Sequence, residues 1–336
     1  MRQADPARER RSIAQLIEEP PMRLVSYIGP EDAGTAVVAG DRLIPVFDGF
    51  LSGLDLDPES LDDLRRRAIA LEGARGIPTD EVELIAPVPV PGKIVCVGLN
   101  YREHATEGGR PVPARPLLFS KFANAVVADG QPIVRPEGSH ALDLEVELGV
   151  VIGSTARRVS RAEALDHVAG YVVVNDVSAR DWQGVPAALH EGEVGDGQWL
   201  RAKGSDTFLP MGSVFVTADE IPDPQTLRLW SWIVPGSGRR PGREVLMQQG
   251  TTADMIWSVA ELIEHISRSI TLEAGDIVAT GTPSGVGVFR DPPVFLQPGD
   301  RARCQIERIC SMENPVIDWT DDEVDEFDFD ETVGND

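Results

Sequence analysis

Between residue 92 and about residue 317, the chain consists mainly of short apolar runs separated by turns rich in Gly, Pro and Asp. Apolar runs of this length between such turns are typical of β-strands, and few segments show a helical pattern. Because many short strands must bury their apolar sides together, the pattern predicts a β-rich α+β fold. The strands that we expect here are residues 94–97, 145–152, 171–175, 213–217, 227–234, 276–280 and 301–306.

Two segments of this region are predicted to be helices. The first begins at Ser160, because Ser160 and Glu163 have the spacing of a capping box. The second extends from about Thr252 to Ser269, because its apolar residues recur every three or four positions and therefore share one face.

The chain is predicted to have four parts. Residues 1–21 form an N-terminal extension, and residues 22–91 form a small N-terminal β domain that ends in a proline-rich linker. Residues 92–317 form a second, larger domain. Residues 318–336 alternate acids with Val and Phe, cannot build a core alone, and are expected to be disordered.

The net charge of −24 argues against nucleic acid or an anionic membrane as a partner, because phosphate groups would be repelled. No apolar run approaches the length of a membrane span, and the N-terminus lacks the apolar stretch of a signal peptide, so we expect a cytoplasmic location. The chain has only three lysines, Lys93, Lys121 and Lys203. Their scarcity makes each lysine a candidate for a specific role.

The clearest candidate for a functional site is a set of acidic residues. Residues 142–148 alternate acidic and apolar residues, so Glu145 and Glu147 point to the same face of a strand. Two carboxylates that enter a core together repel each other unless a positive charge lies between them. Asp176 ends a second apolar run and could supply a third oxygen ligand. Oxygen ligands without nearby Cys or His suit Mg²⁺ or Mn²⁺.

Two further segments carry groups that are useful in catalysis. His104 and Glu107 are three residues apart, so they are neighbours if the segment is helical, and a carboxylate that orients an imidazole makes a general base. Residues 275–287 are predicted to form a strand followed by a glycine-rich loop, which can offer backbone N–H groups and hydroxyls to a ligand.

Together these segments resemble the fumarylacetoacetate hydrolase family. The resemblance rests on five motifs in the family's order, which span about two-thirds of the chain. They are Gly-Leu-Asn-Tyr-x-x-His at 98–104, Asp-x-Glu-x-Glu-Leu at 143–148, Asn-Asp-Val-Ser-Ala-Arg-Asp at 175–181, Lys-x-x-Asp-Thr-Phe at 203–208 and Thr-Gly-Thr-Pro-x-Gly-Val-Gly at 280–287.

The resemblance implies a mixed β-sandwich or roll, a homodimer, and a divalent metal, Mg²⁺ or Mn²⁺, held by Glu145, Glu147 and Asp176. It implies that the substrate is a small 2-oxo acid whose α-keto carboxylate chelates this metal. By the same resemblance, His104 and Glu107 would activate water and Lys203 would stabilise an enolate. The residues that it implies for substrate contact are Arg180, Gln183, Thr282, Gly281 and Tyr101.

The chain departs from the family's pattern at two apparent insertions. The first, Gly184 to Gly197, contains His190, Glu191 and Glu193, and the second lies near residues 235–249. Both are expected to reshape the mouth of the pocket, so they bear on the substrate more than on the metal site.

Three hypotheses about function follow. The leading one is a hydrolase of aromatic or sugar-acid catabolism that cleaves a C–C bond in a 2,4-dioxo acid of the acylpyruvate or fumarylpyruvate type, through a metal-stabilised pyruvate enolate. The second keeps the metal site but makes the protein an oxaloacetate decarboxylase or a 2-oxo acid isomerase or hydratase. The third is a catalytically inactive binding protein. The presence of His104 and Glu107 favours hydrolysis, and the intact set of acids argues against the third hypothesis.

Overall fold

The structure is a computed structural model, and it describes residues 22–30, 32–51, 56–71, 76–236 and 243–320. The expected N-terminal extension, most of the expected acidic tail and residues 237–242 of the second insertion lie outside the described residues. None of the described helices is long and apolar enough to cross a membrane.

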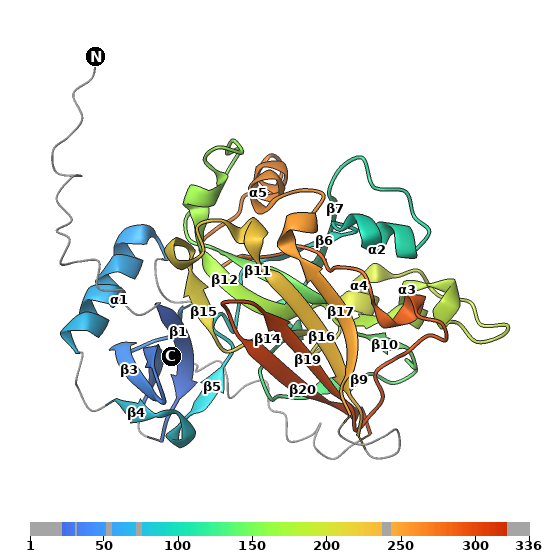
Figure 1. Cartoon of the computed structure of the whole chain (residues 1–336), viewed down its shortest axis with the longest axis horizontal. Helices are drawn as coiled ribbons and strands as arrows, with labels where there is room; N and C mark the ends of the chain where they lie inside the picture. The colour runs from blue at the N-terminus through green and yellow to red at the C-terminus, as the bar shows by residue number, and fades with distance from the viewer. Residues whose placement is uncertain (1–21, 31, 52–55, 72–75, 237–242, 321–336) are drawn as a thin grey trace.

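One large mixed sheet contains thirteen of the described strands, and its main path runs β4-β3-β2-β1-β15-β12-β11-β18-β6-β7 (Figure 1). The strands of this path are β1 (Arg23–Ile28), β2 (Ala33–Ala39), β3 (Arg42–Phe47), β4 (Ile77–Pro78), β6 (Ile94–Gly98), β7 (Leu117–Lys121), β11 (Val146–Ile152), β12 (Val168–Asn175), β15 (Phe215–Thr217) and β18 (Ile277–Ala279). The other three strands are β5 (Glu83–Ile85), β8 (Val126–Ala128) and β14 (Leu209–Met211). The N-terminal strands join this sheet where β1 pairs with β15.

A second sheet packs against the first. It has the order β17-β16-β19-β20-β9. Its strands are β9 (Ile133–Arg135), β16 (Arg228–Val234), β17 (Val245–Thr251), β19 (Arg301–Ile306) and β20 (Ser311–Asp318). A short pair, β10 (Leu142–Asp143) and β13 (Ser178–Ala179), lies beside the acidic residues. Leu148 of β11 shares a buried cluster with Leu229 and Ile306, so one face of β11 meets the second sheet.

The described α-helices are short and lie outside the sheets (Figure 1). They are α1 (Pro58–Ala70), α2 (Arg102–Glu107), α3 (Arg180–Gln183), α4 (Trp199–Gly204) and α5 (Val259–Ser267). The described 3₁₀ helices are η4 (Thr79–Glu81), η5 (Ala123–Ala125), η6 (Ala164–His167), η7 (Pro186–Ala188), η8 (Ala218–Glu220), η9 (Pro224–Thr226), η10 (Thr252–Asp254) and η11 (Gly287–Phe289).

Both helix predictions in the larger region need correction. Ser160 does bond to the side chain of Glu163, but the segment between Ser160 and β12 forms only the 3₁₀ helix η6, because β12 begins at Val168 and leaves no room for another turn. The helix predicted from Thr252 begins only at Val259. Ser258 and Glu261 form a capping box there, and this cap fixes the start of α5.

The predicted strands are all present, and their ends differ from the predictions by at most three residues. The β-rich α+β fold predicted from the sequence is therefore confirmed. For the site, the decisive feature is the antiparallel pairing of β11 with β12, in which Val146 lies opposite Asn175 and Glu147 opposite Val174.

Candidate active site

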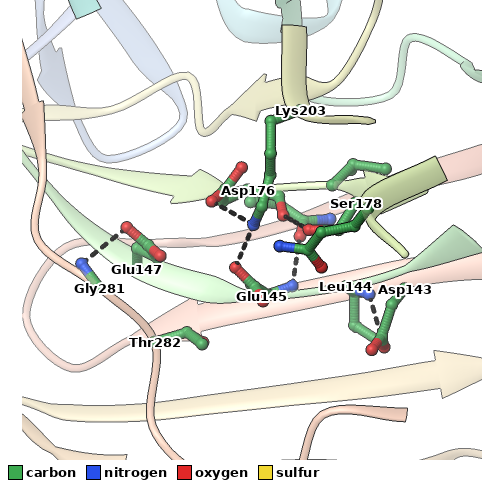
Figure 2. A network of polar contacts seen from close by, with 12 residues as sticks. Asp143, Leu144, Glu145, Glu147, Asp176, Ser178, Lys203, Gly281 and Thr282 are labelled. Atoms are coloured by element: carbon green, nitrogen blue, oxygen red, sulfur yellow. Dashed lines mark hydrogen bonds and ion pairs between the residues drawn. The ribbon is translucent and has the colours of Figure 1, made fainter. Parts of the chain in front are cut away.

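Glu145, Glu147 and Asp176 lie together inside the protein (Figure 2). Each offers a carboxylate oxygen, and these oxygens are all within 4.8 Å of one another. Glu147 lies on β11, Glu145 directly precedes it, and Asp176 directly follows β12. The pairing of the two strands brings the acids together, and the Asp176 N–H donates to the Glu145 carbonyl oxygen at 2.9 Å.

Two cations neutralise Glu145. Lys203, from α4, places its Nζ 2.7 Å from Glu145 Oε2 and 2.6 Å from Asp176 Oδ2 (Figure 2). Arg180, from α3, contacts Glu145 Oε1 at 2.5 Å. Burial alone would raise the pKa of Glu145, but the charges of Arg180 and Lys203 hold it well below its usual range. Burial likewise opposes the charge of Lys203, and Asp176 and Glu145 nevertheless raise the pKa of its ammonium group.

Glu147 has different neighbours from Glu145. Its Oε2 accepts the N–H of Gly281 at 2.8 Å, and no ion pair to Glu147 occurs within the described part of the chain. Burial, and then the nearby charges of Asp176 and Glu145, raise the pKa of Glu147 well above its ordinary value. A divalent cation between the three carboxylates would supply the missing positive charge, and an oxygen-only ligand set suits Mg²⁺ or Mn²⁺. These residues therefore fit such an ion.

The N–H that Glu147 accepts depends on a glycine. Gly281 has a φ of +96°, in the region that favours glycine. A Cβ added to Gly281 would lie 2.7 Å from the Cβ of Asn100. The glycine of the Thr-Gly-Thr-Pro motif thus lets the loop approach the acids closely.

Lys121 is a second buried lysine at this site, and our sequence analysis did not place it there. Its Nζ forms an ion pair with Asp176 Oδ1 at 2.7 Å and donates to the carbonyl oxygens of Val177, Phe208 and Lys203. Burial lowers the pKa of its ammonium group, and the neighbouring Asp176 opposes that effect. Its rarity as one of three lysines was the only signal in the sequence that could have pointed to it.

Asp143 is another residue that the sequence analysis did not assign. Its carboxylate accepts the N–H groups of Gly287 at 2.8 Å and of Val288 at 3.1 Å, and it accepts from Arg180 Nε at 2.9 Å. Asp143 thus connects the glycine-rich loop to the arginine that contacts Glu145. Its spacing of two residues from Glu145 is the strand periodicity that could have identified it.

His104 and Glu107 are neighbours on α2, as predicted. His104 Nδ1 and Glu107 Oε1 are 2.7 Å apart, and His104 is buried. The second carboxylate oxygen of Glu107 accepts the N–H of Gly285 at 2.8 Å, so the pair is fastened to the glycine-rich loop. With Nδ1 engaged in this way, Nε2 is the ring nitrogen that remains for chemistry.

These groups surround a small cavity of about 50 Å³. Its polar wall consists of the three carboxylates, His104, Arg110, Arg180, Gln183, Lys203 and Thr282, and its apolar wall includes Phe119, Trp199 and Phe289. Thr282 donates to the Val146 carbonyl oxygen at 2.9 Å, which fixes the loop beside β11.

Three of the predicted site residues do not line this cavity. Glu107 and Gly281 act behind it, through their bonds to His104 and Glu147. Tyr101 is buried and lines a neighbouring cavity with Asp254 and Met255. The structure therefore brings the predicted residues together, except that Tyr101 faces a different cavity.

The cavity combines two kinds of group. Arg180, Lys203 and the place for a divalent cation are suited to a small anion that carries several oxygens. The His104–Glu107 pair is suited to moving a proton. This combination suits proton transfer on a small oxo acid.

Comparisons with known proteins agree with this description. Residues 93–317 match the family described as fumarylacetoacetate (FAA) hydrolase, C-terminal. The chain is 44% identical over 252 residues to the mitochondrial oxaloacetate tautomerase FAHD2B of Bos taurus, a match that covers 75% of this chain and 74% of the relative.

Solved structures with this fold are also similar. A 2-hydroxyhepta-2,4-diene-1,7-dioate isomerase from Mycobacterium marinum has a TM-score of 0.66 at 32% identity, covering 89% of this chain and 100% of that chain. A fumarylacetoacetate hydrolase from Exiguobacterium antarcticum has a TM-score of 0.68 at 32% identity, covering 88% and 99%. The motifs, the fold and these matches agree, and the chain belongs to the fumarylacetoacetate hydrolase family.

Proposed function

We propose that this protein is a divalent-metal-dependent enzyme that interconverts the keto and enol forms of a small 2-oxo dicarboxylic acid, with oxaloacetate as the first substrate to test. One observation carries the proposal. One cavity is lined by Arg180, Lys203, the carboxylate triad and His104, and Glu107 holds the His104 ring from behind. Relatives named oxaloacetate tautomerase, 44% identical in the bovine protein, support the same reaction class.

The cationic side chains would bind and orient the substrate. Arg180 lies 2.5 Å from Glu145 and presents its guanidinium at the cavity wall, where it can pair with a substrate carboxylate. Lys203 stays protonated between Glu145 and Asp176 and can hold a negatively charged substrate oxygen.

A divalent cation, Mg²⁺ or Mn²⁺, held by Glu145, Glu147 and Asp176 would act as a Lewis acid that favours negative charge on the substrate oxygens. The protein's own part is the movement of a proton. His104 Nε2 would take a proton from the carbon next to the keto group, and the electron pair of that C–H bond would form the C=C bond and leave the charge on the keto oxygen. The imidazole would then give the proton to that oxygen to complete the enol. Glu107 would hold the ring in place through Nδ1.

The C–C bond hydrolase of acylpyruvate-like 2,4-dioxo acids is the second candidate. The observation that favours it is the same His104–Glu107 pair, because an oriented imidazole can activate a water molecule as well as move a substrate proton. Decarboxylation of oxaloacetate needs no such base, so it depends less on His104.

The test compares three reactions in the presence of Mn²⁺. Loss of enol absorbance reports tautomerisation of oxaloacetate, release of pyruvate from acetylpyruvate reports hydrolysis, and release of CO₂ from oxaloacetate reports decarboxylation. We expect tautomerisation to be the fastest reaction, and we expect His104→Asn to lower its rate about 100-fold or more.

A matched control is His265→Asn, on α5 and outside the cavity, which is expected to keep the full rate. Rapid acetylpyruvate cleavage that requires His104, without acceleration of tautomerisation, would replace the proposal by the hydrolase. Rapid release of CO₂ that survives His104→Asn would replace it by the decarboxylase.

A further inference from the structure

A second cluster of metal-binding groups lies in the first insertion. His190 and Glu193 belong to residues 184–197, and His140 lies two residues before the short strand β10. One ligand atom from each of the three side chains lies within 4.8 Å of the others. His140 Nε2 is 3.6 Å from Glu193 Oε2, and the rings of His140 and His190 stack with their centroids 4.0 Å apart.

The orientation of His140 is fixed from behind. Its Nδ1 is 3.2 Å from Asp181 Oδ2, and that oxygen also accepts the His140 N–H at 2.9 Å. Asp181 is itself buried and is held by the hydroxyl of Ser139 at 2.9 Å and the N–H of Trp182 at 3.0 Å. A carboxylate on one ring nitrogen is the arrangement that, in metal sites, sets the tautomer and directs the other nitrogen to the ion.

The ligand set differs from that of the carboxylate triad. Two imidazole nitrogens and one carboxylate oxygen are the donors that Zn²⁺ and similar ions of the late first transition row prefer. His140 Nε2 donates to the carbonyl oxygen of Ala188 at 3.0 Å, so an ion bound by Nε2 would take the place of this hydrogen bond.

The insertion is continuous with the active-site wall, so an ion bound in it would restrain that wall. The chain enters and leaves the insertion at glycines that lie against each other, since a Cβ added to Gly195 would lie 2.5 Å from the Cα of Gly184. Gly184 directly follows α3, which carries Arg180 and Gln183, and Val185 lines the active-site cavity. The tip, with His190 and Glu193, returns to His140.

We propose that His140, His190 and Glu193 form a second metal site for Zn²⁺ or an ion of similar chemistry, and that the bound ion fastens the 184–197 insertion to the wall of the active site. The site is separate from the carboxylate triad in both position and ligand type. It does not depend on which reaction the triad supports.

The test measures Zn²⁺ binding to protein that carries Glu147→Gln, which weakens the first site. Calorimetry and the visible spectrum of Co²⁺ used in place of Zn²⁺ are the two readouts. We expect one Zn²⁺ per chain in this background, and we expect adding His190→Ala to weaken its binding about 10-fold or more. Adding His265→Ala, on α5, is the matched control and is expected to leave binding unchanged.

Limited proteolysis gives an independent readout of the proposed clamp. Glu191 is exposed in the insertion, and Zn²⁺ is expected to slow cleavage after it by a glutamate-specific protease, but only when His190 is present. Equal Zn²⁺ affinity with and without His190→Ala, or no Zn²⁺ bound by the Glu147→Gln protein, would overturn the proposal. Since His190 is exposed, a failure of the His190→Ala variant to fold is not expected, and its thermal unfolding serves as the check.

Discussion

Asp176 contacts two lysines, and the two do not have the same surroundings. Lys203 lines the active-site cavity, whereas Lys121 is completely enclosed and also donates to three backbone carbonyl oxygens. Lys121 therefore fixes the side of Asp176 that faces away from the substrate. It also ties β7 to the segments that carry Val177, Phe208 and Lys203.

We expect Lys121→Met to lower the free energy of unfolding by about 3–5 kcal/mol, because it leaves Asp176 Oδ1 without its ion-pair partner and removes a donor from three buried carbonyl oxygens. Urea denaturation measures this loss. Lys93→Met is the matched control, since Lys93 is partly exposed and pairs with Glu273 at 2.6 Å and Asp276 at 2.8 Å. Asp276 keeps two backbone N–H donors in this variant, so the loss should be clearly smaller. Equal losses for the two variants would contradict the role given to Lys121.

The residues of the site differ in how far the sequence could predict them. Glu145 and Glu147 follow from strand alternation within one segment, and His104 and Glu107 follow from helical spacing. Lys121 touches residues that are 55 to 87 positions away in the chain. No local pattern encodes contacts at that separation, so the sequence alone left Lys121 unassigned.

At the scale of single elements, β1 contains a tyrosine with a shifted pKa. Tyr27 is buried and donates to Asp32 Oδ2 at 3.1 Å. Burial, and then the hydrogen bond and charge of Asp32, raise the pKa of Tyr27 from 10.0 to about 12. Because the folded state holds this proton more tightly than the unfolded state, the stability it contributes is complete below pH 10 and is lost as the pH rises toward 12.

We therefore expect the melting temperature of the wild type to fall more steeply between pH 10 and 12 than that of Tyr27→Phe, which has no phenol to titrate. Thermal unfolding followed by circular dichroism at several pH values in this range measures the difference. Parallel curves for the two proteins would show that Tyr27 does not contribute to the pH dependence.

The helices were harder to predict than the strands, because a capping pattern does not show how far a helix extends. The capping pattern at Ser160 is real, but the next strand begins eight residues later at Val168 and prevents a full helix. The same pattern at Ser258 and Glu261 succeeds, because an apolar face with Leu262 and Ile266 packs into the core behind it. Capping chemistry marks a start, and tertiary packing decides whether a helix follows.

At the scale of the whole molecule, the net charge of −24 is the dominant electrostatic feature. Repulsion among like charges destabilises a compact state, and salt reduces it, with a screening length of about 10 Å at 0.1 M. We expect the melting temperature at neutral pH to rise as NaCl is added. Glucose at equal osmolality is the control, and an unchanged or lower melting temperature in NaCl would show that local ion pairs outweigh the overall repulsion.

The overall architecture could be predicted in outline only. Apolar runs and turn residues were enough to predict a β-rich fold, and the motifs were enough to identify the family. Neither signal could show that β1 pairs with β15. In that pairing Arg23 lies opposite Val216 and Leu24 opposite Phe215. This pairing joins segments almost two hundred residues apart, and such pairings depend on the packing of the whole sheet rather than on local sequence.

The central claim is that Glu145, Glu147 and Asp176 hold a divalent cation, and its most direct test is calorimetric titration of Mn²⁺ into the wild type and Glu147→Gln after treatment with a chelator. The account predicts that Glu147→Gln loses one Mn²⁺ site per chain. It also predicts that the metal-free variant melts at a higher temperature than the metal-free wild type, because a buried carboxylate without an ion-pair partner has been removed. Equal Mn²⁺ binding by the two proteins would contradict the account.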